Sequence, residues 1–274
     1  MSQVIESFEH NGLSLRYISS GSGSHLVIAF HGFGRAPEEY LFITDYPGIR
    51  LLSIYLPGHP GSDEMVADTI DLAVWCQLME KMIERYEAHR ITVVGYSLGG
   101  RIAISTCMNW QIRNFRLLLL APDGIQMHGL LRFAMRRSVF IRLFKGLLTY
   151  PNFLMRLTQI LGQLRVLSKP TCHFFLRQLR DDSKRQIIKK VYSLFRHFIE
   201  SEKMTHHFFD DLSHRLKIVL GQQDPIIRAD MVFKLPKLIQ ENSVMIIEDA
   251  GHDLLSNPYV DQWKTFLIDT NSNE

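Results

Sequence analysis

The sequence predicts an α/β fold in which a mostly parallel central sheet is flanked by helices, with an all-helical segment inserted between two strands. Short apolar strands alternate with helical patterns before residue 125 and again after residue 210. This alternation is typical of a parallel sheet covered on both faces. Between residues 126 and 209 the pattern holds only basic amphipathic helices, broken by Pro151 and Pro170.

The charge of the chain changes at nearly the same boundaries. Residues 131–200 contain fifteen Lys and Arg against three Asp and Glu, whereas the rest of the chain contains sixteen against twenty-five. A strongly basic middle segment in an otherwise acidic chain indicates a separate structural unit. We therefore predict a core formed by residues 1–125 and 210–274, and a helical cap, or lid, formed by residues 126–209.

The predicted elements begin with a hairpin. Residues 4–8 and 13–19 flank Asn11-Gly12, a pair typical of a two-residue hairpin turn. The apolar runs at 25–30 and 51–56 are followed by glycine or proline, which predicts two buried strands. Further strands are predicted at 91–94, 115–121, 216–220 and 244–247, and helices at 70–86, 98–110, 184–199, 228–241 and 259–268.

The composition, with 46% hydrophobic and 22% charged residues, is ordinary for a globular protein. The first residues lack a basic stretch and an apolar stretch, so no signal peptide is expected, and no apolar run is long enough to span a bilayer. Cys76, Cys107 and Cys172 are few and far apart, which favours a reducing compartment and predicts a cytoplasmic location. His206 and His207 point apart because they are adjacent, so no metal or cofactor is expected.

The clearest functional signal is the segment from Gly95 to Gly99, which reads Gly-Tyr-Ser-Leu-Gly. It follows a β-branched strand and opens a helical pattern. Ser97 would then protrude from the carboxyl edge of the sheet on a tight turn at a helix N-terminus. This context predicts a nucleophilic serine, and the alternative is a glycine-rich structural turn.

A nucleophilic serine needs a general base within hydrogen-bond reach. His252 follows the last predicted strand, at 244–247. Because loops that follow parallel strands meet at one edge of the sheet, His252 is expected beside Ser97. The chain has twelve histidines, and each of them could simply have a surface or packing role. His252 is selected only by its position after the last predicted strand.

The base in turn needs a carboxylate that holds its tautomer. Asp224 follows the strand at 216–220 and is the preferred candidate. Asp123 follows another strand on the same edge and is the main alternative. Asp249 and Asp253 are close to the histidine in sequence, where a carboxylate does not easily reach under the ring.

Two backbone donors are expected to stabilise an oxyanion. One is the N–H of Leu98, directly after the nucleophile. The other comes from His31-Gly32-Phe33-Gly34, with the N–H of Phe33 preferred and that of Gly34 as the alternative. The side chain of His31 is expected to brace its own loop, and the whole segment could also be a glycine turn without a catalytic part.

These motifs occur in the order found in the α/β-hydrolase superfamily, which the chain resembles over residues 1–125 and about 210–270. The matching segments are His-Gly-Phe-Gly, Leu-Pro-Gly-His-Pro-Gly-Ser-Asp, Gly-Tyr-Ser-Leu-Gly-Gly, Gly-Gln-Gln-Asp and Ala-Gly-His. The resemblance implies the α/β-hydrolase fold, a triad of Ser97, Asp224 and His252, and a helical cap. Family members usually have glycine where this chain has Pro60. A serine nucleophile argues against haloalkane dehalogenases and epoxide hydrolases, which use aspartate.

The cations of the predicted cap admit three interpretations. They form a solvated outer face, or they bind an anionic substrate such as a carboxylate or a coenzyme A thioester. In the third interpretation they contact an acidic membrane peripherally, because residues 130–148 mix Arg and Lys with Phe, Leu and Ile. No motif supports nucleic-acid binding, and none is expected.

Tyr96 and Arg101 are the candidate substrate contacts beside the nucleophile. Arg101 lies one helical turn after Ser97, where it pairs with a structural carboxylate or meets a carboxylate of the substrate. The segment Gly-Tyr-Ser-Leu-Gly-Gly-Arg also resembles that of the menaquinone-pathway lyase, which uses the triad for proton abstraction.

The first hypothesis is therefore a metal-independent serine hydrolase that cleaves a small ester or thioester, anionic or acyl-chain bearing, through an acyl-enzyme. The second is the lyase, acting on an anionic substrate. The third is a ligand-binding protein that keeps the fold without turnover. The sequence indicates neither the natural substrate nor the oligomeric state.

Overall fold

The computed structural model describes residues 3–65, 67–125, 136–165 and 167–268. Its centre is an eight-stranded sheet in the order β1-β2-β4-β3-β5-β6-β7-β8. The strands are β1 Val4–His10, β2 Leu13–Gly21, β3 His25–Phe30, β4 Ile49–Ile54, β5 Arg90–Tyr96, β6 Arg116–Leu120, β7 Leu216–Gly221 and β8 Val244–Ile247. Only β1–β2 and β2–β4 pair antiparallel; the other five pairs are parallel. The predicted mostly parallel sheet is confirmed.

The sheet is buried on both faces, as its apolar strands require. Alternate residues of β3 point to opposite sides. Leu26 and Ile28 pack into a hydrophobic cluster that includes Trp75. Val27 packs into a second cluster that includes Trp263. The sheet therefore needs a helical layer on each side.

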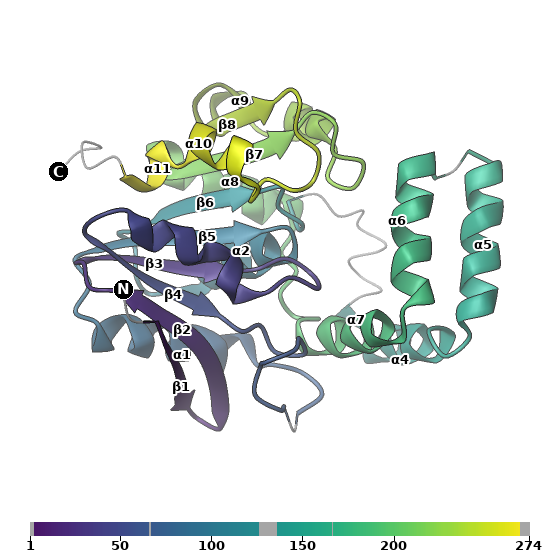
Figure 1. Cartoon of the computed structure of the whole chain (residues 1–274), viewed down its shortest axis with the longest axis horizontal. Helices are drawn as coiled ribbons and strands as arrows, with labels where there is room; N and C mark the ends of the chain where they lie inside the picture. The colour runs from purple at the N-terminus through teal and green to yellow at the C-terminus, as the bar shows by residue number, and fades with distance from the viewer. Residues whose placement is uncertain (1–2, 66, 126–135, 166, 269–274) are drawn as a thin grey trace.

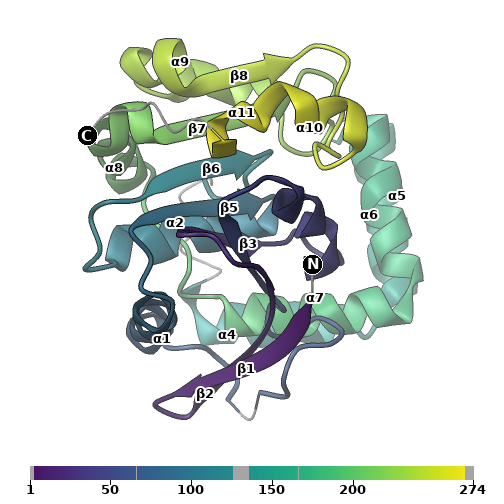
Figure 2. The same ribbon diagram turned by 60° about the vertical axis from the view of Figure 1, so that its left-hand side comes forward.

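One layer contains α1 Leu72–Arg85, α2 Leu98–Asn109, α8 Glu202–Leu212 and α9 Lys237–Ser243. The other contains the 3-10 helix η1 Pro37–Asp45, α10 Asn257–Trp263 and α11 Thr265–Ile268. Figure 2 shows α10 and α11 on the opposite side of the sheet from α1 and α8. This arrangement confirms helices on both faces of the sheet.

Several predicted elements have wrong bounds. The helix expected at 184–199 ends at Leu194, and the one expected at 259–268 is two helices, α10 and α11. The single helix expected at 228–241 is a 3-10 helix at Ala229–Lys234 followed by α9, and it breaks at Pro236. Proline lacks the N–H that would continue the helix and holds the preceding Leu235 in an extended conformation. The strand expected at 51–56 lies two residues earlier, at β4.

The segment between β6 and β7 is helical throughout its described part. It contains α4 Ser138–Leu147, α5 Pro151–Gln163, α6 Lys169–Arg180, α7 Asp182–Leu194 and then α8. Helices α4–α7 stand off from the sheet on the side toward which the parallel strands point (Figure 1). Helix α8 packs with the core through Phe209, and the end of α7 does so through Val191 and Leu194. The division at residue 209 and the function of α4–α7 as a cap stay predictions.

Part of the predicted cap, residues 126–135, lies outside the described residues, and with it the beginning of the basic segment 130–148. Within the described ranges, no helix has the length and apolar character needed to cross a membrane.

Candidate active site

Ser97 occupies the turn between β5 and α2. Its backbone has a positive φ of 52° with ψ −116°, a conformation that costs energy for any residue with a side chain. The turn is tight enough to require glycine on both sides. A Cβ atom at Gly95 would lie 2.5 Å from the carbonyl oxygen of Gly99, and one at Gly99 would lie 1.9 Å from the carbonyl oxygen of Phe30.

Backbone hydrogen bonds hold this turn against the neighbouring strand. The N–H of Ser97 donates to the carbonyl of Leu120 at 2.9 Å. The carbonyl of Ser97 accepts from the N–H groups of Gly100 and Asp123, both at 2.9 Å. The strained conformation is therefore fixed by the ends of β5 and β6, and the hydroxyl projects from the carboxyl edge of the sheet.

His252 lies beside Ser97, on the loop after β8. The distance from His252 Nε2 to Ser97 Oγ is 3.0 Å, and His252 Nδ1 lies 2.6 Å from Asp224 Oδ2. An ionised carboxylate can only accept, so Nδ1 carries the proton and Nε2 is left to accept from the serine hydroxyl. This is the arrangement in which a histidine can remove the proton of a serine.

Asp224 is itself rigidly held at the end of β7. Its side chain is fully buried, and its second oxygen accepts hydrogen bonds from the N–H groups of Ile226 at 2.7 Å and Ile227 at 2.9 Å. These donors compensate the burial of the carboxylate and stabilise its charged form.

The rival carboxylates have other partners. Asp123 forms an ion pair with Arg101, and Asp253 forms one with Arg35 at 3.0 Å. Asp249 is exposed, and its carbonyl accepts from Tyr259. In the described part of the chain, Asp224 is the carboxylate that the structure brings to His252.

The loop after β3 lies against the turn that carries Ser97. A Cβ atom at Gly32 would lie 3.4 Å from Cβ of Ser97 and 2.7 Å from the ring of Tyr96. The backbone N–H groups of Phe33 and Leu98 have no acceptor among the described residues. Two unpaired donors next to Ser97 suit an oxyanion, and the choice between Phe33 and Gly34 stays open.

His31 braces this loop. The N–H of Leu56 donates to His31 Nε2 at 3.2 Å, so Nδ1 carries the proton and donates to the carbonyl of Gly32 at 2.8 Å. Burial lowers the pKa of His31 to about 3, and His59 lies edge-on to it with ring centroids 4.8 Å apart. His31 is thus a neutral structural group, as the sequence predicts.

The side chain of Tyr96 points toward the loop that carries His252. Its hydroxyl donates to the backbone carbonyl of His252 at 3.1 Å, and its ring lies under the guanidinium of Arg35, 5.5 Å from the ring centre. Burial raises the pKa of Tyr96 well above its usual range, so the phenol stays protonated and keeps this bond. Tyr96 therefore supports the loop that carries His252.

Arg101 is buried beneath the turn that carries Ser97. Its guanidinium pairs with Asp123 and lies 5.8 Å from the centre of the Tyr192 ring on α7. The nearby carboxylate raises the pKa of Arg101 despite its burial. Arg101 joins α2, the loop after β6 and α7. Sequence reasoning missed Tyr192, because one tyrosine in an amphipathic helix carries no signal of its partner.

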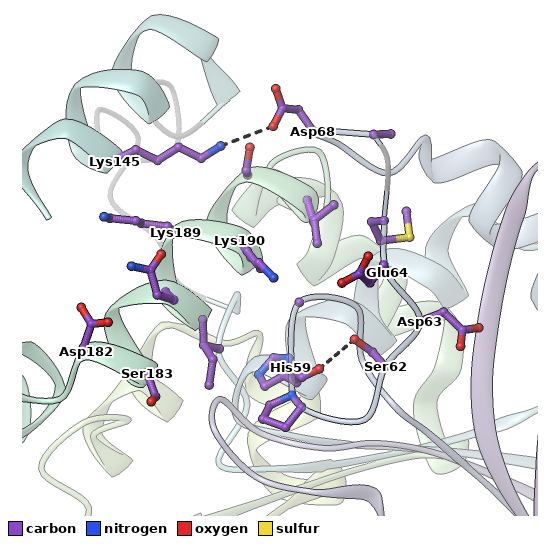
Figure 3. Close-up of a pocket in the computed structure, with 18 residues that line it drawn as sticks. His59, Ser62, Asp63, Glu64, Asp68, Lys145, Asp182, Ser183, Lys189 and Lys190 are labelled. Carbon is purple, nitrogen blue, oxygen red and sulfur yellow. Dashed lines mark hydrogen bonds and ion pairs between the residues drawn. The ribbon is translucent and has the colours of Figure 1, made fainter. Parts of the chain in front are cut away.

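Two cavities lie beside this site. One, of about 740 Å³, lies between residues 58–68 and α7 and is lined by Lys189 and Lys190, but not by Ser97 or His252 (Figure 3). The other, of about 600 Å³, lies between the loop that carries Asp224 and the start of α6. There the hydroxyl of Thr171 donates to the carbonyl of Pro225 at 3.0 Å. The inserted helices are therefore tied to the loop after β7.

Sequence comparison finds relatives with several activities. The chain is 28% identical over 116 residues to the dihydrolipoyllysine-residue acetyltransferase component of the acetoin cleaving system of Cupriavidus necator, covering 42% of this chain. That match spans only 31% of the longer relative. It is 20% identical over 253 residues to 2-hydroxy-6-oxononadienedioate/2-hydroxy-6-oxononatrienedioate hydrolase 1 of Pseudomonas putida, covering 88% of this chain and 86% of the relative.

A third relative matches over a shorter stretch. The chain is 32% identical over 80 residues to 2-succinyl-6-hydroxy-2,4-cyclohexadiene-1-carboxylate synthase of Klebsiella pneumoniae, which covers 29% of this chain and 31% of that protein. The chain thus spans about a third of two of these three relatives.

Solved structures match over nearly the whole chain. The structure of MenH from S. aureus superposes with a TM-score of 0.61 at 19% identity, covering 92% of this chain and 96% of that one. The esterase EaEST from Exiguobacterium antarcticum superposes with a TM-score of 0.57 at 16% identity, covering 95% and 97%. At these identities the likeness shows the fold. Residues 26–266 also match the profile described as the alpha/beta hydrolase family, which spans most of the chain. On this match, supported by the strand order and the tight turn at Ser97, the chain belongs to the alpha/beta hydrolase family.

Proposed function

We propose that this protein is a serine hydrolase that cleaves a small carboxylic ester or thioester through an acyl-enzyme intermediate. The observation that carries the proposal is the continuous hydrogen-bonded line from Ser97 Oγ through His252 to the buried Asp224, with distances of 3.0 and 2.6 Å. A serine with a paired base and an oriented tautomer is an activated nucleophile. The family and its hydrolase relatives support the same reaction class.

In the proposed reaction Ser97 attacks the carbonyl carbon while His252 Nε2 takes the hydroxyl proton. Asp224 holds the imidazolium in place. The N–H groups of Leu98 and Phe33 stabilise the negative charge on the carbonyl oxygen. His252 then passes its proton to the leaving alcohol or thiol. Water, activated by the same histidine, attacks the acyl-enzyme and releases the acid and the free serine.

A second candidate is the lyase that uses the triad for proton abstraction on an anionic substrate. The observation that favours it is the 32% identity to the Klebsiella pneumoniae synthase over 80 residues. The pairing of Arg101 with Asp123 and Tyr192 speaks against it, because that guanidinium is already engaged and buried. Hydrolysis of an ester or thioester is therefore the preferred proposal. We assign the protein to the cytoplasm because its three cysteines are free thiols.

The experiment is labelling of the purified protein with a fluorophosphonate probe, beside turnover of p-nitrophenyl esters of increasing acyl length. Ser97→Ala is the control that removes the nucleophile, and Ser62→Ala, a serine bonded to the carbonyl of His59, is a matched control. We expect labelling and turnover in the wild type and in Ser62→Ala, and neither in Ser97→Ala.

Labelling without turnover of any ester would move the assignment to the lyase. A protein that is neither labelled nor active would be a ligand-binding member of the family.

A further inference from the structure

The exposed apolar side chains of this protein are concentrated on the inserted helices. Eighteen large apolar residues are exposed in the described part of the chain, and eleven of them lie between residues 139 and 175. On α4 they include Val139, Phe140, Leu143 and Leu147, which share one helical face. A soluble helix normally turns such a face to the core, and a large exposed apolar patch marks a contact surface.

Helix α5 continues the pattern. Phe153, Leu157 and Ile160 are exposed at a spacing of four and three residues, again one face of a helix. We call the exposed apolar faces of α4 and α5 the α4–α5 surface. In Figure 1 both helices lie beyond the ends of the parallel strands, apart from the helical layers on the two faces of the sheet.

The same stretch carries cations without any anion. Residues 124–180 contain ten Lys or Arg and no Asp or Glu. Arg142 and Arg156 are exposed on α4 and α5 themselves. Lys145 of α4 pairs with Asp68 of the core at 3.5 Å. A surface that mixes exposed Leu and Phe with Arg, on helices that carry no carboxylate of their own, fits an anionic bilayer surface. The apolar side chains enter the acyl region and the cations meet lipid phosphates.

We propose that the α4–α5 surface docks this protein peripherally on anionic membranes. The positive charge of this surface argues against a second copy of the chain as the partner, because two basic surfaces docked face to face would repel each other. Nucleic acid would use the cations but leave the apolar stripes exposed.

Docking at this surface would also place the catalytic edge near the lipid. The inserted helices lie on the side of the sheet toward which the parallel strands point, and Ser97, Asp224 and His252 follow three of these strands (Figure 1). Esters with acyl chains concentrate in bilayers, so the surface would bring the proposed site to its substrate. Membrane binding does not depend on the proposed hydrolysis, and the two are tested separately.

The test is sedimentation of the full chain with unilamellar vesicles of phosphatidylcholine, with or without about one quarter phosphatidylglycerol. At about 0.1 M salt the protein should bind the anionic vesicles at least about tenfold more tightly than the neutral ones. Raising the salt to about 0.5 M shortens the reach of the charges and should weaken binding strongly. Ser97→Ala should bind like the wild type whether or not hydrolysis is confirmed.

Matched variants test the apolar contribution. The double variant Leu143→Gln/Phe153→Gln removes side chains that are 60% and 56% exposed, so the fold should be kept. Its affinity for anionic vesicles should fall about tenfold or more. The control Leu238→Gln/Phe233→Gln changes the same residue types at 54% and 80% exposure, on α9 and on the 3-10 helix before it, outside the α4–α5 surface. It should bind like the wild type.

A second pair of variants tests the charge. Arg142→Gln/Arg156→Gln should lower the affinity about 25-fold, at about fivefold per cation near the membrane. The control Arg113→Gln/Lys234→Gln removes two exposed cations of the core. It should change the affinity for anionic vesicles less than about twofold.

Equal binding to neutral and anionic vesicles, no binding to either, or equal loss in the control variants would overturn the proposal. Sedimentation velocity provides a further check. If the wild type is a dimer that Leu143→Gln/Phe153→Gln converts to a monomer, the surface is a self-association interface and the membrane proposal fails.

Discussion

The hydroxyl of Tyr96 donates a hydrogen bond to the backbone carbonyl of His252, with 3.1 Å between the two oxygens. The two rings also contact each other, with centroids 5.3 Å apart. Tyr96 directly precedes Ser97, so the residue before the proposed nucleophile fixes the loop that carries the proposed base. The separation of Ser97 and His252 therefore depends on a side chain that takes no part in the proposed proton transfer.

Replacing Tyr96 by Phe should lower kcat about fivefold and leave KM nearly unchanged, because one hydrogen bond that positions the base is lost. Steady-state kinetics with the preferred p-nitrophenyl ester provide the measurement. Tyr17→Phe is the matched control, since that hydroxyl donates to a carboxylate oxygen of Glu6 at 3.2 Å and links β2 to β1, which carry none of the three residues. An equal loss of kcat in both variants would contradict a positioning role for Tyr96.

Asp224→Asn should lower kcat by about four orders of magnitude. The amide oxygen can still accept from Ile226 and Ile227, but the NH₂ group then faces His252 Nδ1 and enforces the wrong tautomer. Asp253→Asn is the control, because that exposed carboxylate pairs with Arg35 instead, and it should change kcat less than about threefold. Comparable losses in the two variants would remove Asp224 from its proposed role.

Asp123→Asn should lower the free energy of unfolding by about 3 kcal/mol, because it leaves the buried guanidinium of Arg101 without its carboxylate. Urea denaturation followed by circular dichroism measures this. The exposed pair of Arg228 and Asp230, 2.6 Å apart, provides the comparison. Asp230→Asn should cost less than about 1 kcal/mol. A small effect of Asp123→Asn would mean that Tyr192 alone satisfies Arg101.

Stability should fall as the pH drops below neutrality because three histidines are buried in neutral form. Burial lowers the pKa of His31 to about 3 and those of His25 and His59 to about 4, from 6.5 in an unfolded chain. Between pH 6.5 and 4 the unfolded chain therefore binds more protons than the folded one, so the free energy of unfolding rises with pH there. Above pH 6.5 these groups are neutral in both states and contribute no slope.

Urea midpoints measured from about pH 7 to about pH 5 check this expectation. Each buried histidine contributes a slope of about 1.4 kcal/mol per pH unit. His59→Gln should reduce the slope by about one proton, since glutamine does not titrate. A slope unchanged by His59→Gln would show that the imidazole is protonated in the folded protein.

The sequence predicts those parts of the structure that follow from neighbouring residues. The first hairpin has its turn at Asn11 and Gly12, as predicted, and both residues have positive φ. Strands β3 and β8 have the predicted bounds. Ser97 and His252 could be selected because each follows a parallel strand, and such strands end at one edge. Asp224 and Asp123 satisfy the same rule, so the sequence could rank them but not exclude either.

Contacts between distant segments could not be predicted in this way. Arg101 was expected to meet a carboxylate or a substrate, and only the structure shows Asp123 and Tyr192 around it. The tyrosine lies on α7, whose periodic pattern predicts a helix but not what the helix packs against. For the same reason, the sequence shows that the inserted helices are amphipathic without showing which apolar faces are buried.

The backbone of Gly99 lies directly against the carbonyl of Phe30. This close approach has a consequence for how substrate range and chemical competence can change in evolution. Because no Cβ fits there, the nucleophile turn and the loop of the proposed oxyanion donors are registered by main chain against main chain. Side chains of the inserted helices can then be exchanged without moving this turn relative to that loop. Under the proposed cap function, variation in the inserted helices would alter the pocket for the substrate while this backbone contact keeps its geometry, so that substrate range and chemical competence would evolve independently.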